Sequence, residues 1–357
     1  MSKESRMNQK SGTLCLGVVG AGSLGYHHTR IARDLPGVQM QGFFEVRNDR
    51  AREVAEELRV RAAPSLHELL DRVDAVVVAT PTSTHEEVAV QALERGVHVF
   101  IEKPIAPDLD AADRILEAAD RGGALVQVGH VERFNDAVVA AQPYLDTPLF
   151  IESHRLAPFT ERGTDVAVVL DLMIHDVDLV GSLVGSPVER IDATGVPILT
   201  PSVDIANARI SYENGAVANL TASRVSLDRM RKLRIFQRSG YLSLDLANGT
   251  GEFLKLKEEI PALLPQGTTQ AQGGGATDWS AAAQAVSARG LEALVERIPL
   301  QGDGEEPLRR EQTSFVQAIQ GQRDPAVSGR EGREALAVAL TIESKIMSHV
   351  ADSRPTS

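Results

Sequence analysis

A lysine, an aspartate and a histidine are the residues whose types and positions suggest chemistry. Lys103 follows an apolar run, His98–Ile101, and precedes Pro104. Asp171 and His175 are four residues apart in an apolar segment, so a helix would place both on one face. An ammonium can stabilise an oxygen that gains negative charge, and an imidazole can accept a proton near neutral pH. These groups could assist oxidation of a hydroxyl, although a surface turn and a structural Asp–His pair are the simpler alternatives.

A glycine-rich turn near the N-terminus predicts a dinucleotide site. The β-branched run Leu14–Val19 ends at Gly20-x-Gly22-x-x-Gly25, and a helical pattern begins at about Ser23. In such sites the first glycine allows the tight turn, the second lets the backbone approach a pyrophosphate, and the third lets helix and strand pack closely. The free N–H groups of the helix would face the phosphates. A purely structural turn between strand and helix is the alternative.

An acidic residue stands where a ribose-binding carboxylate is expected. The second predicted strand, Val38–Glu45, ends twenty positions after Gly25. A carboxylate there can accept hydrogen bonds from both ribose hydroxyls and would repel a 2′-phosphate, which favours NAD over NADP. Arg47 and Arg50 are close enough in sequence to weaken that repulsion. Strand ends also carry charged residues simply because they reach solvent.

The elements that would position these residues alternate between strand and helix through the first 130 residues, which predicts parallel βαβ units. Ligands of open parallel sheets bind beyond the carboxyl ends of the strands, so the glycine turn, Glu45, Thr80–Ser83 and Glu102–Lys103 should share one rim. The predicted strands are Leu14–Val19, Val38–Glu45, Asp74–Ala79, His98–Ile101 and Ala124–Val128. The predicted helices are Ser23–Asp34, Asp49–Leu58, Ser83–Arg95 (with Ser83 and Glu86 as a capping box) and Asp110–Arg121.

Successive strands dominate the second half, which predicts an α+β domain. Its strands are expected at Leu149–His154, Val188–Val196, Asp204–Tyr212, Ala216–Ser223, Leu233–Gln237 and Gly240–Leu246, and its helices at Asp136–Tyr144, Asp165–Val184, Pro307–Gly321 and Gly332–His349. Leu264–Ala282 is rich in Gly, Gln and Thr and is predicted to be a mobile loop. The predicted fold is thus an α/β Rossmann domain at residues 12–129 and an α+β domain with a largely antiparallel open sheet at residues 130–350.

Composition narrows the classes of partner. The 357-residue chain has a formal net charge of −12, which argues against a general affinity for nucleic acid or anionic membranes. Its one cysteine, Cys15, fits a reducing compartment. The first ten residues are polar, and no apolar run approaches the roughly twenty residues that span a bilayer. We therefore expect a cytoplasmic protein with a small-molecule substrate.

Taken together, the motifs resemble the Gfo/Idh/MocA family of NAD(P)-dependent sugar and polyol dehydrogenases. The matching stretches, from roughly Leu14 to Met347, are G-A-G-S-L-G (Gly20–Gly25), A-T-P-T-S-T-H (Ala79–His85), E-K-P (Glu102–Pro104) and the Asp171/His175 pair. The resemblance implies that Lys103, Asp171 and His175 are catalytic and that the Lys103–Pro104 bond is cis. It also implies a homodimer or homotetramer assembled through the open sheet.

Two further segments, Gly129–Asn135 (G-H-V-E-R-F-N) and His154–Asp165, are similar to family members that oxidise C3 of a UDP-linked N-acetylamino sugar. Three arginines in or next to them could pair with a pyrophosphate, or could instead form salt bridges between domains. By resemblance, the substrate-binding residues are Lys103, Arg133, Phe134, Arg155, Arg162, Asp171 and His175. The cofactor-binding residues are Gly20, Gly22, Ser23, Leu24, Gly25, Glu45, Arg47, Thr80, Pro81, Thr82, His85, Glu102 and Lys103.

The expected reaction is hydride transfer from a secondary sugar hydroxyl to NAD. His175 would accept the hydroxyl proton, Lys103 would stabilise the oxygen, and Asp171 would orient the pair. An inositol or free-sugar dehydrogenase is one alternative, and a non-catalytic dinucleotide-binding regulator is another. A metal site on Asp171, His175 and a further histidine (His130 or His154) is disfavoured, because only two ligands share a helix.

Overall fold

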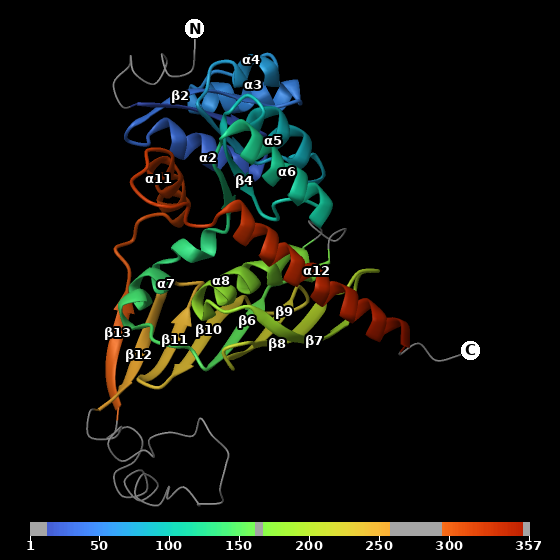
Figure 1. Ribbon diagram of the computed structural model, residues 1–357, viewed down its shortest axis with the longest axis vertical. Helices are drawn as coiled ribbons and strands as arrows, with labels where there is room; N and C mark the ends of the chain where they lie inside the picture. Colours follow the sequence, from blue (N-terminus) through green and yellow to red (C-terminus); the bar gives the residue numbers. More distant parts are fainter. Residues whose placement is uncertain (1–12, 161–166, 258–294, 353–357) are drawn as a thin grey trace, which may run out of the picture.

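Two sheets organise the chain, one in each half, and helices lie between them (Figure 1). The computed structural model describes residues 13–160, 167–257 and 295–352, with side chains up to residue 349. Arg162 and the segment Leu264–Ala282 lie outside these described residues.

The first sheet has five parallel strands in the order β2-β1-β3-β4-β5. All four residues of β3 are buried, as expected for a strand covered on both faces. The predicted Rossmann half is therefore confirmed. Its strands are β1 (Leu14–Val19), β2 (Val38–Phe44), β3 (Ala75–Val78), β4 (His98–Glu102) and β5 (Val126–Gly129), and its helices are α2 (Ser23–Arg33), α3 (Asn48–Leu58), α4 (Leu66–Leu70), α5 (His85–Leu93) and α6 (Leu109–Gly122).

The second sheet has eight strands in the order β13-β12-β11-β10-β6-β9-β8-β7, and every neighbouring pair except β6 and β9 is antiparallel. This confirms the predicted, largely antiparallel sheet. The strands are β6 (Phe150–Leu156), β7 (Val188–Val196), β8 (Ile205–Tyr212), β9 (Val217–Ser223), β10 (Met230–Gln237), β11 (Gly240–Asp245), β12 (Thr250–Leu256) and β13 (Val295–Gln301).

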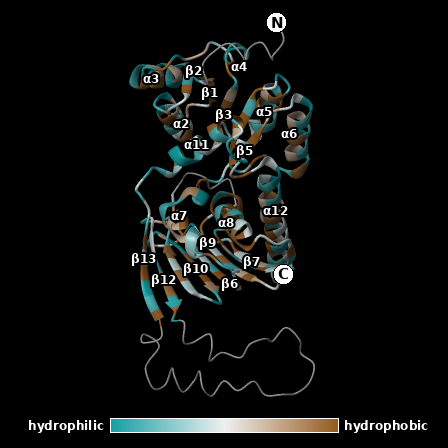
Figure 2. Ribbon diagram, turned by 60° about the vertical axis from the view of Figure 1, so that its left-hand side comes forward, coloured by the Kyte–Doolittle hydropathy of each residue, from teal (hydrophilic) through white to brown (hydrophobic). Residues whose placement is uncertain are grey.

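Helices cover the face of this sheet that is turned toward the first half of the chain, as Figures 1 and 2 show from two sides. Along β8, Ala206 and Ala208 are buried under these helices, whereas Asn207 and Arg209 are exposed on the opposite face. The covering helices are α7 (Asp136–Ala141), α8 (Ile174–Val184) and α12 (Gly329–Asp352).

The last two helices join the halves. Phe315 and Val316 of α11 (Pro307–Ile319) share a hydrophobic core with β1, and Leu336 of α12 packs in the core of the parallel sheet. Ile342 and Ile346, further along α12, pack instead in the core of the second sheet. The division into domains at residues 129 and 130 stays a prediction, and α11 and α12 contribute to both sides of it.

Two predicted features differ from the structure, and two strands were not predicted. The helix predicted at Asp165–Val184 has a π-helical segment, η4 (Val169–Met173), before the regular α8. The predicted capping box at Ser83 is wrong: η1 (Thr82–Thr84) precedes α5, whose N-cap makes no side-chain hydrogen bond. Strands β12 and β13 were not predicted, because charged residues interrupt their apolar positions.

Candidate active site

The glycine-rich turn has the space that a dinucleotide phosphate needs. A Cβ on Gly25 would lie 2.0 Å from the carbonyl oxygen of Gly20, and Gly20 itself has a φ of +90°. A Cβ on Gly22 would meet nothing within 4 Å, so the backbone there is open to an approaching group. No side chain caps the start of α2 at Gly22. The turn therefore fits the pyrophosphate of a dinucleotide.

Glu45 lies beside the glycine-rich turn and is hydrogen-bonded to it. Its carboxylate accepts hydrogen bonds from the backbone N–H of Ala21 (2.9 Å) and from the N–H and Nε of Arg47 (3.1 and 3.0 Å). Burial acts to raise the pKa of Glu45, but these hydrogen bonds outweigh it and hold the pKa below its usual value. Glu45 is thus an ionised group at the end of β2, where a ribose-binding carboxylate is expected.

The ring of His85 lies between two backbone carbonyl groups, one of Thr80 after β3 and one of Pro104 after β4. Its Nε2 lies 3.0 Å from the carbonyl oxygen of Thr80, and its Nδ1 lies 3.0 Å from that of Pro104. Burial lowers the pKa of His85, and a neutral ring has one N–H to donate to these two acceptors. The Lys103–Pro104 peptide bond is cis, as the resemblance implies.

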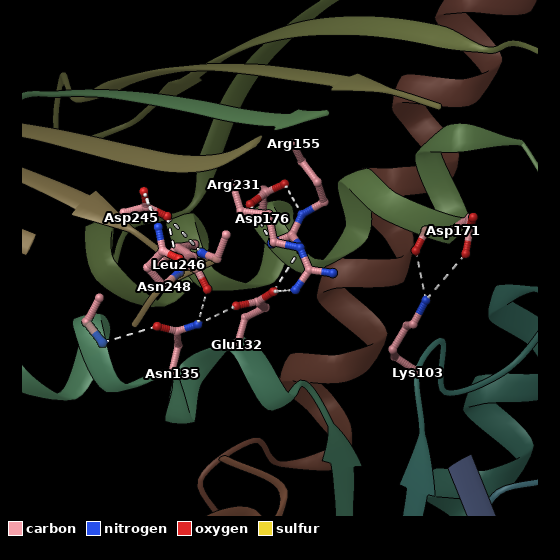
Figure 3. A network of polar contacts seen from close by, with 12 residues as sticks. Lys103, Glu132, Asn135, Arg155, Asp171, Asp176, Arg231, Asp245, Leu246 and Asn248 are labelled. Carbon is pink, nitrogen blue, oxygen red and sulfur yellow. Dashed lines mark hydrogen bonds and ion pairs between the residues drawn. The ribbon is translucent and has the colours of Figure 1, made fainter. Parts of the chain in front are cut away.

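Lys103 meets Asp171 across the boundary between the halves (Figure 3). Its Nζ donates a hydrogen bond to the carbonyl oxygen of Asp171 (2.8 Å) and lies 4.0 Å from the carboxylate oxygen Oδ1. Burial lowers the pKa of Lys103, and the charges of Asp171 and Glu102 offset this in part. The lysine side chain is 18% exposed and the aspartate 39%, so the pair lies at the edge of the buried region.

His175 lies one helical turn beyond Asp171 and is within electrostatic reach of Lys103. Burial, followed by the charges of Lys103 and Arg155, holds the pKa of His175 well below its usual value. The imidazole is therefore neutral at pH 7 and able to accept a proton. It is a weaker base than an unperturbed histidine. Its Nδ1 is buried and has no hydrogen-bond partner among the described residues.

Arg155 is surrounded by protein carboxylates. Its Nε and Nη2 donate to Asp176 (2.8 and 3.0 Å), and its Nη1 donates to Glu132 (2.8 Å), as Figure 3 shows. All three side chains are at least nine-tenths buried. These contacts are salt bridges within the second half of the chain, rather than the bridges between domains that were the alternative to pairing with a substrate pyrophosphate.

Arg133 is engaged in a similar way. It makes two hydrogen bonds to Asp178 (2.8 and 2.7 Å) and one to Glu331 of α12 (2.9 Å). Its neighbour Phe134 is buried and lines a cavity of about 590 Å³ between α7, α8 and α11. The catalytic candidates do not line this cavity. Arg133 and Phe134 therefore line a different cavity from the one that Lys103 and Asp171 would border, and their role in substrate binding stays a prediction.

Two buried carboxylates, Glu132 and Asp176, were not predicted as parts of the site, and His130 was considered only as a metal ligand. Glu132 and Asp176 hold Arg155, and His130 lies near Asp178, with 3.9 Å between its Nδ1 and the carboxylate. Only Glu132 stands next to a predicted arginine in the sequence, whereas Asp176 lies 21 residues from Arg155. Across the described ranges, no group of three or more His, Cys, Asp or Glu side chains is arranged to hold a metal ion, and no helix is long and apolar enough to cross a membrane.

The fold and the site are together those of a dehydrogenase that uses a nicotinamide dinucleotide. Residues 14–130 match the family model described as "Oxidoreductase family, NAD-binding Rossmann fold", and residues 145–243 match "GFO/IDH/MocA C-terminal domain". The chain belongs to the Gfo/Idh/MocA family of oxidoreductases. The alternative of a non-catalytic regulator is set aside on this ground.

Relatives of two kinds match the chain. UDP-N-acetylglucosamine 3-dehydrogenase of Acidithiobacillus ferrooxidans is 42% identical over 235 residues, covering 66% of this chain and 74% of that protein. A solved structure of that name and organism superposes with a TM-score of 0.80 at 33% identity, covering 94% of this chain and 98% of that one. The scyllo-inositol 2-dehydrogenase (NAD(+)) of Bacillus subtilis is 29% identical over 228 residues, covering 58% of this chain and 67% of that protein.

Proposed function

We propose that the protein oxidises a secondary hydroxyl of a sugar with NAD, and that its substrate is a UDP-linked N-acetylamino sugar oxidised at C3. The observation that carries the proposal is the contact between Lys103 Nζ and Asp171, which brings an ammonium from one half beside His175 of the other. The 42% identity to a UDP-N-acetylglucosamine 3-dehydrogenase supports the choice of substrate.

The two candidate catalytic groups have different roles in the proposed reaction. Neutral His175 accepts the proton of the substrate hydroxyl, and Lys103 stabilises the negative charge that develops on its oxygen. Because the pKa of His175 is low, proton transfer depends on Lys103 making the hydroxyl more acidic. Asp171 keeps Lys103 charged and oriented. The dinucleotide, when bound, supplies the hydride acceptor.

The rim of the parallel sheet would hold that dinucleotide. The glycine turn would receive the pyrophosphate, and Glu45 the adenosine ribose. Arg47 already pairs with Glu45 and is thereby less free to neutralise a 2′-phosphate, which favours NAD over NADP. Thr80–Thr82 and Glu102 complete the proposed cofactor site beside Lys103.

An inositol or free-sugar dehydrogenase is the second candidate. Two observations favour it. Arg133 and Arg155 are each paired with a carboxylate of the protein itself, and the chain matches a scyllo-inositol dehydrogenase. A cofactor-reduction screen with UDP-N-acetylglucosamine, other UDP-sugars and inositol isomers separates the candidates. We expect the largest kcat/KM with UDP-N-acetylglucosamine, and a preference for an inositol would contradict the UDP-sugar assignment.

We further infer a homodimer or homotetramer in the cytoplasm. The face of the second sheet that the helices leave uncovered carries the stacked pair Phe236 and Tyr241, together with polar residues such as Asn207 and Arg209. Burying such a face between subunits would remove apolar surface from water. Light scattering of the purified protein tests the assembly, and a monomer at micromolar concentration would contradict it.

A further inference from the structure

Glu311 of α11 is the least expected buried residue of the described chain. It is 0% exposed, and neither carboxyl oxygen has a hydrogen-bond partner among the described residues. Its backbone carbonyl accepts a hydrogen bond from the amide of Gln127 in β5 (3.2 Å), which fixes its place beneath the parallel sheet. A carboxylate without donors in such a place is costly, whereas a protonated acid has an O–H to donate.

The charged groups around Glu311 are mainly acidic. The carboxylates of Glu102 (β4) and Asp178 (α8) add to the effect of burial and raise its pKa well above the usual value. The other titratable and charged groups of this region are His28 of α2, Lys103 after β4, and His130 and Arg133 on the β5–η2 side. Arg133 is paired with Asp178 and Lys103 donates to Asp171, and among the described residues no cation makes a hydrogen bond to the carboxyl group of Glu311.

The next residue of α11 links this region to the active site. The amide of Gln312 donates to Nδ1 and to the carbonyl oxygen of His28 (2.8 and 3.1 Å). His28 must then carry its proton on Nε2, which lies 2.7 Å from a carboxylate oxygen of Glu102. The other oxygen of Glu102 accepts the backbone N–H of Lys103 (3.2 Å). A chain of contacts thus runs from α11 to Lys103.

We propose that Glu311 is a positioning residue that acts as a neutral acid: it lets α11 pack against Glu102 without charge repulsion, and so holds the Glu102–Lys103 corner in place. The effect on Lys103 rests on the proposed function, whereas the protonation of Glu311 does not. An ionised Glu311 would repel Glu102 and Asp178 and push α11 away from the sheet.

The first test is unfolding as a function of pH, using the neutral isostere Glu311→Gln. A carboxyl whose pKa is raised in the native state stabilises the fold fully at acid pH and loses that stability as pH rises toward the raised pKa. The melting temperature of Glu311→Gln minus that of the wild type should therefore increase by about 2 °C per pH unit above pH 5. Glu334→Gln, at an exposed position of α12, is the matched control and should show a much smaller slope. A difference that does not change with pH would overturn the neutral-acid assignment.

The second test is turnover with UDP-N-acetylglucosamine and NAD. Glu311→Gln should keep kcat within about twofold, whereas Glu311→Ala should lower kcat by roughly 10- to 100-fold with little change in the KM for NAD, as expected for a small displacement of Lys103. Equal losses in both variants would show that the negative charge is needed and would contradict the proposal. If the wild type turns over no sugar, the proposed function fails, while the unfolding test still decides the state of Glu311.

Discussion

Lys103 and Arg155 are two cations within electrostatic reach of each other, and their surroundings differ: Lys103 is partly exposed and Arg155 is buried. Arg155 makes bidentate contacts to Asp176 and a third hydrogen bond to Glu132, and its side chain is only 4% exposed. Lys103 makes one hydrogen bond, to a backbone carbonyl, and its nearest carboxylate oxygen is 4.0 Å away. An ammonium has three donors, so Lys103 can still bind a substrate oxygen, whereas the guanidinium of Arg155 is buried among its carboxylates.

The comparison separates stabilising charges from reactive ones. A buried ion pair with every hydrogen bond made costs much to break and offers little to a ligand. A partly exposed ammonium whose pKa burial has lowered is instead typical of a functional site. Substitution of Arg155 should therefore mainly change stability, and substitution of Lys103 should mainly change turnover.

Arg155→Met should lower the free energy of unfolding by about 3–5 kcal/mol, because it leaves Glu132 and Asp176 buried without their partner. Urea denaturation measures the change. Arg234→Met, on the exposed face of the sheet, is the control and should change stability by less than about 1 kcal/mol. A loss of UDP-sugar binding with unchanged stability would make Arg155 a substrate residue after all.

Lys103→Met should lower kcat by about 10²- to 10³-fold, because the variant lacks the charge that stabilises the substrate oxygen. Its melting temperature should stay close to that of the wild type, since a single hydrogen bond is lost at a partly exposed position. Steady-state cofactor reduction and thermal unfolding measure the two quantities. Full activity in this variant would remove the lysine from the reaction.

The pH profile of kcat/KM should reflect both lowered pKa values. Activity requires neutral His175, so it should persist below pH 6.5 and fall only as pH drops through the lowered pKa of the imidazole. On the alkaline side, activity should be lost when Lys103 loses its proton. Because the pKa of Lys103 is lowered, this loss should occur at a pH lower than 10.5. Asp171→Asn removes the largest influence that raises the pKa of Lys103 and should move the alkaline limb to lower pH. An unmoved limb would mean that another group titrates there.

Glu45→Gln should change cofactor preference by about tenfold or less, the smallest effect of the series. The variant loses the negative charge that repels a 2′-phosphate, and Arg47 is released from its ion pair. The ratio of kcat/KM for NAD to that for NADP should therefore fall. An unchanged ratio would show that Glu45 only holds the glycine turn to β2.

Much of the site could be predicted from sequence, because the features that carry it are local. The glycine spacing, the Lys103–Pro104 corner and the four-residue step from Asp171 to His175 each lie in a single short segment. The parallel sheet also follows from the alternation of apolar strands and amphipathic helices.

The partners of the buried charges could not be predicted, since they come from distant segments. Asp178 lies 45 residues from Arg133, and Asp176 lies 21 residues from Arg155. Nothing in the spacing of Asp178 on its helix indicated that it would pair with an arginine. The π-helical segment could not be predicted, because the change to i→i+5 backbone hydrogen bonds has no sequence signature in an apolar stretch. The return of α11 to the first half, which brings Glu311 beneath Glu102, is a tertiary feature of the same kind.

The central claim is that Lys103 and His175 act on one substrate oxygen, and a double-mutant cycle in turnover tests it most directly. Lys103→Met and His175→Asn are combined, and kcat with UDP-N-acetylglucosamine and NAD is measured for all four proteins. Residues that act as a unit are non-additive, so the double variant should be no more than about tenfold slower than the slower single variant. Losses that multiply would mean that the two groups act independently, and would contradict the account.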